Sequence, residues 1–267
     1  MTASGPTWTE DPHVTVRNRY AQIASTGGCC TPTTAAPGGP AGCCSGGDGG
    51  ECVGYTSDEL AGLPTGADLG LGCGNPTALL ALLPDETVVD LGSGAGIDCF
   101  LAAKRVGPGG RVIGVDMTPE MVERARRNAA RGSYPNVEFR LGEIEHLPLA
   151  DGVADVVISN CVINLVPDKS AVYREAYRVL QPGGRFAVSD LVATRPISEK
   201  DRQDPELWAG CSSGALEVEE VRRRLREVGF WPVSIELRGP AEPAASLSEP
   251  ASLGVLPADI RATKPKE

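Results

Sequence analysis

From about Thr87 onward, short apolar runs alternate along the chain with segments whose apolar side chains recur at helical spacing. The runs TVVDLG, RVIGVD, VEFRLG, VADVVISN and GRFAVSDLVA predict buried strands, and WPVSIELRG predicts a strand after the last helix. The segments TPEMVERARRNAA, DKSAVYREAYRVL and EVEEVRRRLREVGF predict helices. Strands that alternate with helices predict an α/β fold, with a mostly parallel sheet that is covered by helices on both faces.

Residues at the ends of the predicted helices support these boundaries. Thr118 can cap the first helix with Pro119 at its first position, and Asp168 can cap the second helix. The sequence PGG at residues 182–184 should end the second helix, because proline and glycine interrupt helices.

The segments that flank this region have a different composition. Residues 13–25, HVTVRNRYAQIAS, predict an amphipathic helix. Residues 27–54 lack any periodicity and predict an irregular, mobile segment. PADIRATK, near the end of the sequence, predicts a short closing strand.

Composition and charge narrow the class of protein. The chain has 267 residues, enough for a full core, and its net charge of −10 disfavours a nucleic-acid partner, because phosphate backbones repel an acidic protein. The sequence begins without the basic and apolar regions of a signal peptide, and no apolar run approaches the ~20 residues of a membrane span. We therefore expect a cytoplasmic protein with no membrane partner. Its nine cysteines favour metal or redox chemistry over structural disulfides.

A glycine-rich turn follows the first predicted strand. VVDLGSGAGID places Asp90, Gly92, Gly94 and Gly96 between a strand and a helix, where glycines let a ligand approach the backbone closely. A dinucleotide fingerprint would need glycine where Ile97 stands, which weakens a pyrophosphate interpretation. The run D-x-G-x-G-x-G instead resembles the first motif of class I S-adenosylmethionine-dependent methyltransferases. The alternative is a glycine turn that binds nothing, and the features that follow in order disfavour it.

The resemblance to class I methyltransferases extends to later motifs. Asp116 ends the next strand, where an acidic side chain can accept hydrogen bonds from both ribose hydroxyls, and Met117 can pack on the adenine. GEIEHLPLADGVADVVIS resembles the third and fourth motifs and places Glu143 or Ile144 near the adenine. The cofactor-binding residues expected from this resemblance are Asp90, Gly92, Ser93, Gly94, Gly96, Asp116, Met117, Glu143, Ile144 and Asn160.

The methyl acceptor is constrained by what the sequence lacks. An oxygen acceptor must lose a proton, so its enzyme usually supplies a base or a metal. The chain has only two histidines, and no obvious base constellation is present; His146 is expected to be a loop residue. An acceptor with an unprotonated lone pair needs no base, and the sequence is compatible with such an acceptor.

Three widely separated cysteines are expected beside the glycine turn. Cys73 precedes the predicted sheet, Cys161 lies at the carboxyl end of the fourth strand, and Cys211 follows the fifth strand. Ligands of parallel sheets bind outside the carboxyl ends of the strands, and soft thiolates select thiophilic centres. Electrostatics should lower the pKa values of these thiols. Cys99, on the apolar side of a helix, is expected to be a core residue.

Longer motifs resemble one family specifically. GLGCGNPTALL, VVDLGSGAGIDCFLAAKRVGPGGRVIGVDMTPEMVERAR, SNCVINLVPDK and LQPGGRFAVSD are similar to the arsenite methyltransferase family, over roughly residues 13–239. The resemblance implies a seven-stranded, doubly wound sheet and trivalent arsenic held by Cys73, Cys161 and Cys211. It also implies methylation by S-adenosylmethionine, an external thiol reductant such as glutathione or thioredoxin, and arsenite or methylated trivalent arsenicals as substrates. We expect a monomer.

The N-terminal cysteines are also interpreted through this resemblance. The predicted helix followed by Cys29 and Cys30 resembles the family's N-terminus, where a cysteine joins the arsenic site or forms a redox disulfide during turnover, although Ala21 stands where the family usually has glycine. Which of the two cysteines takes this role stays open. Cys43, Cys44 and Cys52 have no clear counterpart, and their spacing does not resemble a zinc site.

The resemblance suggests three segments along the chain. Residues 1–72 hold the N-terminal helix and the cysteine-rich segment, residues 73–195 the S-adenosylmethionine-binding Rossmann-like domain, and residues 196–267 an arsenic-binding loop, a helix and the closing strands. Two other functions stay open from the residues alone: a methyltransferase of the same fold acting on carbon or oxygen of a small metabolite, and a non-enzymatic binder of arsenic or zinc.

Overall fold

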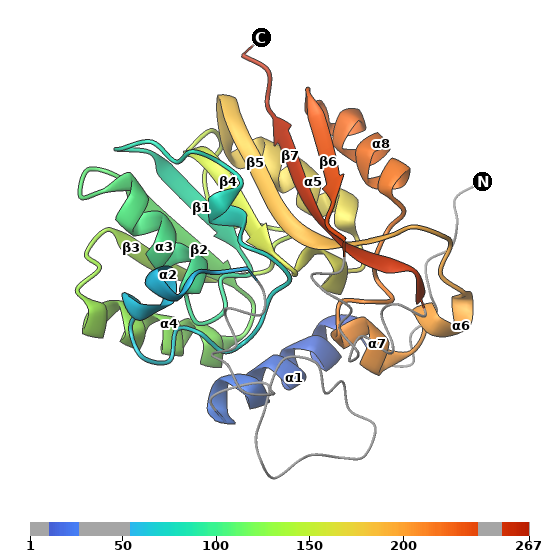
Figure 1. The fold of residues 1–267 in the computed structure, drawn as a ribbon, viewed down its shortest axis with the longest axis horizontal. Coiled ribbons are helices and arrows are strands. Elements are labelled where there is room, and N and C mark those ends of the chain that lie inside the picture. Colours follow the sequence, from blue (N-terminus) through green and yellow to red (C-terminus); the bar gives the residue numbers. More distant parts are fainter. Residues whose placement is uncertain (1–10, 27–53, 240–252, 267) are drawn as a thin grey trace.

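The computed structural model describes residues 11–26, 54–239 and 253–266, and these form one sheet with helices on both faces (Figure 1). The sheet has seven strands in the order β3-β2-β1-β4-β5-β7-β6. Neighbours among β1 to β5 are parallel, whereas β7 runs antiparallel to both β5 and β6. The strands are β1 Thr87–Leu91, β2 Arg111–Asp116, β3 Val137–Leu141, β4 Ala154–Asn160, β5 Leu180–Ala193, β6 Val233–Leu237 and β7 Val255–Thr263. The predicted α/β fold with a mostly parallel sheet is confirmed.

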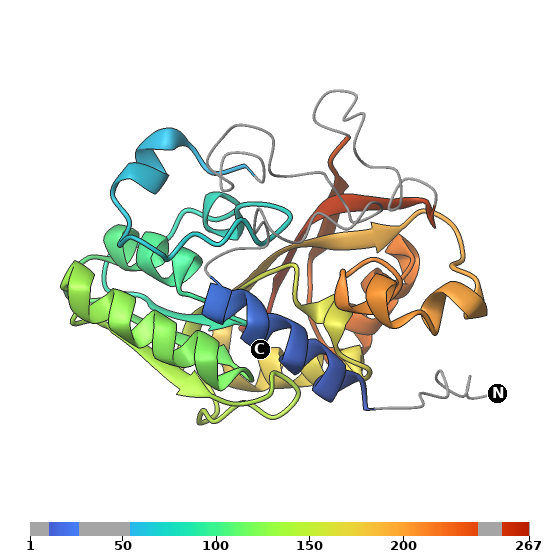
Figure 2. The same cartoon turned by 90° about the horizontal axis from the view of Figure 1, so that it is seen from below.

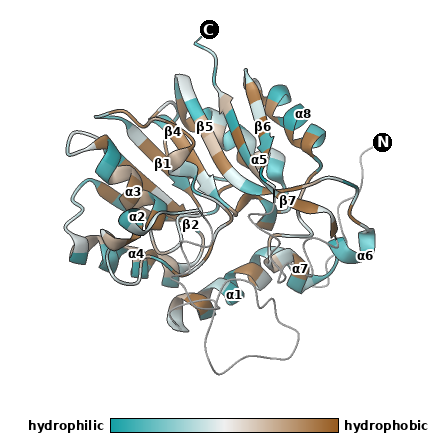
Figure 3. Cartoon of the chain, viewed as in Figure 1, coloured by the Kyte–Doolittle hydropathy of each residue, from teal (hydrophilic) through white to brown (hydrophobic). Residues whose placement is uncertain are grey.

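Successive residues of each central strand point to opposite faces of the sheet, and buried apolar residues lie on both faces. Figure 3 shows apolar residues along the central strands. On one face, Val88 and Val112 pack with α3 (Ile97–Val106) and α4 (Pro119–Gly132). On the other face, Val89 and Ile113 pack with α5 (Lys169–Val179) and α8 (Val218–Val228). This division explains why the strands read as continuous apolar runs in the sequence, and it makes the fold doubly wound.

Helix α1 (Pro12–Thr26) lies across the carboxyl ends of the strands, between α4 and α7 (Pro205–Ala209) (Figure 2). Shorter elements complete the described chain: α2 Ser57–Ala61, α6 Glu199–Arg202 and the 3₁₀ turns η2 Pro76–Ala78 and η3 Ile163–Leu165. In the part of the chain described, no helix is both long and apolar enough to cross a membrane.

The expected helix boundaries hold in part. Asp168 caps α5 by accepting a hydrogen bond from the Ala171 amide at 3.0 Å. Thr118 occupies the cap position of α4, but its side chain makes no capping hydrogen bond. Helix α5 ends at Val179, before the PGG sequence, because Leu180 already pairs with Ala154 at the start of β5. The glycines therefore belong to a long strand rather than to the end of a helix.

Candidate active site

A cavity of about 300 Å³ lies at the carboxyl ends of β1, β2 and β4. In the sheet, β1 has β2 on one side and β4 on the other, so the order of the strands along the chain reverses at β1. The cavity lies at this switch point. Residues of α1 form one wall, among them Val16, Tyr20 and Ile23, and the glycine turn after β1 forms the opposite wall. The position is the usual ligand site of an open α/β sheet.

The glycine turn leaves room for a ligand against the backbone. Gly92 has φ +73°, and a β-carbon there would collide with the Val162 side chain, so glycine is required. The Gly94 amide donates to Asp116 at 2.9 Å. The Ser93 hydroxyl is buried in the cavity wall and has no hydrogen-bond partner among the described residues. A buried polar atom without a partner indicates that a polar ligand group completes the site.

Asp116 is the carboxylate best placed for a hydroxyl-bearing ligand. Its side chain accepts hydrogen bonds from the amides of Gly94 and Thr118, at 2.9 and 2.8 Å, and burial raises its pKa. A carboxylate has about four lone-pair positions, so these two bonds hold it in place while leaving capacity for two hydroxyls.

Other residues expected at the cofactor divide into two groups. Met117, Ile144 and Asn160 line the cavity together with the glycine turn and Asp116. Three expected residues are absent from its lining. Asp90 is buried and accepts a hydrogen bond from Cys99 at 3.2 Å. Gly96 is the cap residue that precedes α3, and Glu143 pairs with Arg17 at 3.3 Å.

A buried polar cluster forms part of the cavity wall, and the sequence pattern does not reveal it. The Tyr55 hydroxyl donates to both oxygens of Asp98 at 2.9 Å, and the Asn160 amide nitrogen donates to the Tyr55 oxygen at 2.8 Å. Burial raises the pKa of Asp98 to about 7, although the bonds from Tyr55 and Asn160 oppose the shift. The acidic residue at the start of α3 was the only sequence signal that could have indicated this cluster.

The three expected cysteines converge at the edge of this cavity. The sulfur atoms of Cys73 and Cys161 and a carboxylate oxygen of Asp190 lie within 4.8 Å of one another. The Cys211 thiol joins them through Cys161, whose carbonyl oxygen it approaches at 2.9 Å. Cys161 and Cys211 also line the cavity. The structure therefore brings together soft donors from three distant parts of the chain, next to the glycine turn.

Two of these cysteines have an unusual backbone conformation. Cys161 has φ +55° and Cys211 has φ +63°, and among the described residues they are two of only four non-glycine positions in this region. Such a conformation costs about 1–2 kcal/mol for a residue with a side chain. The surrounding contacts must therefore hold each thiol in place, as is common at functional sites.

The thiol pKa values differ in direction from the expectation. Burial raises the pKa of Cys73, and contact with Cys161 followed by burial raises that of Cys211. The hydrogen bond with Cys211 lowers the pKa of Cys161, but the contact with Cys73 and burial outweigh it and leave the pKa well above its usual range. The free site is therefore a cluster of protonated thiols, because burial and mutual proximity disfavour several negative charges.

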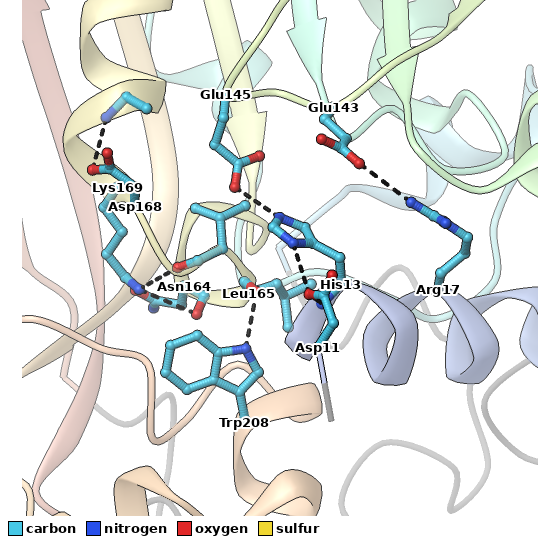
Figure 4. A network of polar contacts seen from close by, with 12 residues as sticks. Asp11, His13, Arg17, Glu143, Glu145, Asn164, Leu165, Asp168, Lys169 and Trp208 are labelled. Carbon is cyan, nitrogen blue, oxygen red and sulfur yellow. Dashed lines mark hydrogen bonds and ion pairs between the residues drawn. The ribbon is translucent and has the colours of Figure 1, made fainter. Parts of the chain in front are cut away.

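A second buried network lies next to the Cys161 loop, and Figure 4 shows its residues Asn164, Lys169 and Trp208. Asp190 accepts hydrogen bonds from the Ile163 amide at 3.1 Å and from the Asn164 side chain at 2.8 Å. Lys169 donates to the Val166 carbonyl at 2.8 Å and lies 4.8 Å from the centre of the Trp208 ring, and burial lowers its pKa to about 7. Burial shifts the carboxyl group of Asp190 in the opposite direction and raises its pKa to about 7. No sequence motif indicated these residues.

Ion pairs attach α1 to the loop after β3 (Figure 4). His13 lies 2.8 Å from Glu145, and Arg17 lies 3.3 Å from Glu143. The hydrogen bond with Glu145 raises the pKa of His13 to about 9, so the histidine is charged at neutral pH. The helix that forms one wall of the cavity is therefore held by charges.

The remaining cysteine predictions have different outcomes. Cys99 is fully buried on the side of α3 that faces the core, as expected. Cys29, Cys30, Cys43, Cys44 and Cys52 lie outside the described residues. His146 is exposed on a loop, in agreement with the expectation.

Comparisons with known proteins identify the family of the chain. A family model described as a methyltransferase domain matches residues 82–229. An arsenite methyltransferase from Halobacterium salinarum is 54% identical over 230 residues, which cover 85% of this chain and 59% of that relative. An arsenite methyltransferase from Aquipseudomonas alcaligenes is 47% identical over 166 residues, 60% of this chain and 47% of that relative.

A solved structure gives the same indication. The crystal structure of CrArsM, an arsenic (III) S-adenosylmethionine methyltransferase from Chlamydomonas reinhardtii, superposes with a TM-score of 0.62 and 36% identity, covering 79% of this chain and 71% of that chain. The chain spans 59% and 47% of the two curated relatives, so they contain regions without a counterpart here. With the fold, the family model and these relatives in agreement, the chain belongs to the arsenite methyltransferase family of class I S-adenosylmethionine-dependent methyltransferases.

Proposed function

We propose that this protein transfers a methyl group from S-adenosylmethionine to trivalent arsenic that is bound by Cys73, Cys161 and Cys211. The observation that carries the proposal is the convergence of these thiols at the edge of the cavity formed by the glycine turn. The relatives named above are arsenite methyltransferases, and their names support the same substrate.

The cavity residues fit the cofactor. Asp116 has free acceptor capacity for the ribose, the Ser93 hydroxyl lacks a partner, and the apolar side chains of Met117 and Ile144 can contact the adenine. When bound, S-adenosylmethionine supplies a methyl group on a positively charged sulfur. The chain's own contribution is to orient the cofactor beside the thiols and to exclude water with the wall that α1 provides.

The thiol cluster fits trivalent arsenic because no base is needed to load it. Each protonated thiol can replace one hydroxyl group of arsenite, and the thiol proton leaves with that hydroxyl as water. Three such exchanges give arsenic bound to three sulfurs, which keeps a lone pair. That pair could form the new bond to the methyl group while the methyl–sulfur bond of the donor breaks and S-adenosylhomocysteine leaves, so no proton has to be lost from arsenic. Holding arsenic and methyl donor in line is then the main catalytic task of the site.

The cellular setting follows from the ligand chemistry. Because arsenic binding requires free thiols, we propose action in the cytoplasm with an external thiol reductant such as glutathione or thioredoxin. We further propose that Cys29 or Cys30 assists the site, that methylated trivalent arsenicals are also substrates, and that the chain acts as a monomer.

The segment boundaries remain part of this proposal. We assign residues 1–72, 73–195 and 196–267 to the N-terminal segment, the cofactor-binding domain and the C-terminal arsenic-binding segment. Cys211 in the last segment contacts Cys161 in the second, which supports a site shared between them.

The decisive experiment is speciation of arsenic after the purified protein has been incubated with arsenite, S-adenosylmethionine and glutathione. We expect methylated arsenicals from the wild-type protein and none from Cys161→Ser. Cys99→Ser is the matched control, because Cys99 is a buried core cysteine away from the other thiols, and it should retain product formation. Unchanged turnover in Cys161→Ser would reject the three-thiol site.

A further inference from the structure

A chain of hydrogen bonds between buried side chains connects the cofactor cavity with the loop that carries Cys73. It begins at Asp98, which lines the cavity and is 3% exposed. The Tyr55 hydroxyl donates to Asp98 at 2.9 Å, and Asn160 donates to the Tyr55 oxygen at 2.8 Å. Asn160 also donates to the Gly74 carbonyl at 2.7 Å, and its amide oxygen accepts from the Cys73 amide at 2.9 Å. The loop is therefore held by both ends of one side-chain amide.

The amide nitrogen of Asn160 has more acceptors within reach than hydrogens to donate. The Tyr55 oxygen and the Gly74 carbonyl lie closest, and the Asp98 carboxylate lies at 3.3 Å, whereas the amide has two hydrogens. The Asp98 carboxylate thus competes with the Cys73 loop for the same donor. A cation beside Asp98 makes this carboxylate a weaker competitor and leaves both hydrogens to the other two acceptors.

The loop that carries Cys73 packs directly against the Asn160 side chain. A β-carbon at Gly72 would meet the amide of Asn160, which shows that the loop backbone packs directly on this side chain. The other side of the loop is held by Arg238, which donates to the Cys73 carbonyl. A change in the hydrogen bonds of Asn160 therefore alters the support of the Cys73 thiol.

We propose that Tyr55 and Asn160 are positioning residues that couple the two sites, so that the cofactor and trivalent arsenic each increase the affinity of the other. The inference rests on the proposed function. The feature that transmits the effect is the positively charged α-ammonium group at the amino-acid end of the cofactor, attracted by the Asp98 carboxylate. Reciprocity requires that both ligands change each other's affinity by the same factor.

The test measures binding rather than turnover. Arsenite affinity is determined by equilibrium dialysis with and without saturating S-adenosylhomocysteine, which cannot donate a methyl group but keeps the amino-acid end with its α-ammonium group. Cys161→Ser, measured in parallel, reports binding by cysteines outside the site. We expect arsenite to bind about fivefold or more tightly in the presence of S-adenosylhomocysteine. Calorimetry should show the same factor for S-adenosylhomocysteine when arsenite is present.

Two comparisons isolate the proposed route. Tyr55→Phe keeps the ring and removes the hydroxyl, and it should still bind each ligand but bring the affinity ratio close to one. The matched control Tyr134→Phe removes a surface hydroxyl that donates to the Gly62 carbonyl at 3.5 Å, and it should keep the wild-type ratio. In the wild-type protein, methylthioadenosine lacks the amino-acid end and should leave arsenite affinity unchanged.

The outcomes separate the coupling from the function. A wild-type ratio in Tyr55→Phe, or equal coupling by methylthioadenosine and S-adenosylhomocysteine, would overturn the inference. The second comparison needs no substitution, so it decides even if Tyr55→Phe does not fold. A wild-type protein that methylates arsenite but shows a ratio of one refutes the coupling alone. Absence of both arsenite binding and methylated product refutes the coupling and the proposed function together.

Discussion

The ion pair between His13 and Glu145 makes the stability of the protein depend on pH in a way that one substitution can isolate. The His13 ring nitrogen lies 2.8 Å from the Glu145 carboxylate, and the hydrogen bond between them raises the pKa of His13 from 6.5 to about 9. The folded protein therefore binds this proton more tightly than the unfolded chain does. The stabilisation is complete below pH 6.5 and is lost as the pH rises through about 9.

The size of the effect follows from the pKa shift. One pKa unit corresponds to 1.36 kcal/mol, so a shift of about 2.5 units sets an upper limit of roughly 3 kcal/mol. The side chains are 21% and 7% exposed, and solvent screens part of the interaction. We therefore expect His13 to contribute about 1–2 kcal/mol to the free energy of unfolding at pH 6.

Urea unfolding at pH 6 and pH 9.5 tests this value with His13→Gln. The variant should be less stable than the wild-type protein by about 1–2 kcal/mol at pH 6 and about equally stable at pH 9.5. His146→Gln is the matched control, because His146 is the chain's other histidine and is exposed. Other titratable groups are common to all three proteins, so their contributions cancel in the differences. A difference between wild type and His13→Gln that stays constant with pH would refute the reasoning.

Three further substitutions separate strain, cofactor binding and core packing. Cys161→Gly removes a thiol from a backbone position in the left-handed region. Arsenic speciation should show no methylation, and the free energy of unfolding should stay equal or rise by up to about 1 kcal/mol, because glycine adopts this conformation without strain. Clear destabilisation would contradict this prediction. Asp116→Asn should weaken S-adenosylhomocysteine binding about tenfold by calorimetry and leave arsenite binding without cofactor unchanged. Cys99→Ala should keep methylation and lose about 1–3 kcal/mol in urea unfolding, because the buried Asp90 loses its donor.

The parts of the site that the sequence predicted depend on local pattern or on a rule of topology. The glycine turn follows β1 and Asp116 ends β2, and both strands are clear apolar runs. The sequence alone therefore predicted the positions of these residues at the ends of the two strands. Cys161 directly follows β4, and the rule that ligands lie at the carboxyl ends of parallel strands placed it beside the turn. Both inferences need only the order of the elements along the chain.

The parts that the sequence did not predict are long-range contacts between buried polar groups. Tyr55 meets Asp98 and Asn160 across 43 and 105 residues of sequence, and nothing in the pattern around Tyr55 marks it as buried. Lys169 begins α5 as an ordinary polar residue, yet it is 3% exposed. Such partners become visible only after the sheet order brings their loops together.

The direction of the thiol pKa values was one expectation that failed, and its failure clarifies the chemistry. A cluster of thiolates beside the buried Asp190 would place several negative charges in one apolar site, which is costly without cations. Protonated thiols avoid that cost. Arsenite is itself neutral, and exchange of its hydroxyls for thiols releases water, so the charge of the site does not change as arsenic binds. Burial can therefore raise the pKa of Cys73 and Cys211 without hindering the loading of the site, and the same burial keeps water away from the lone pair that receives the methyl group.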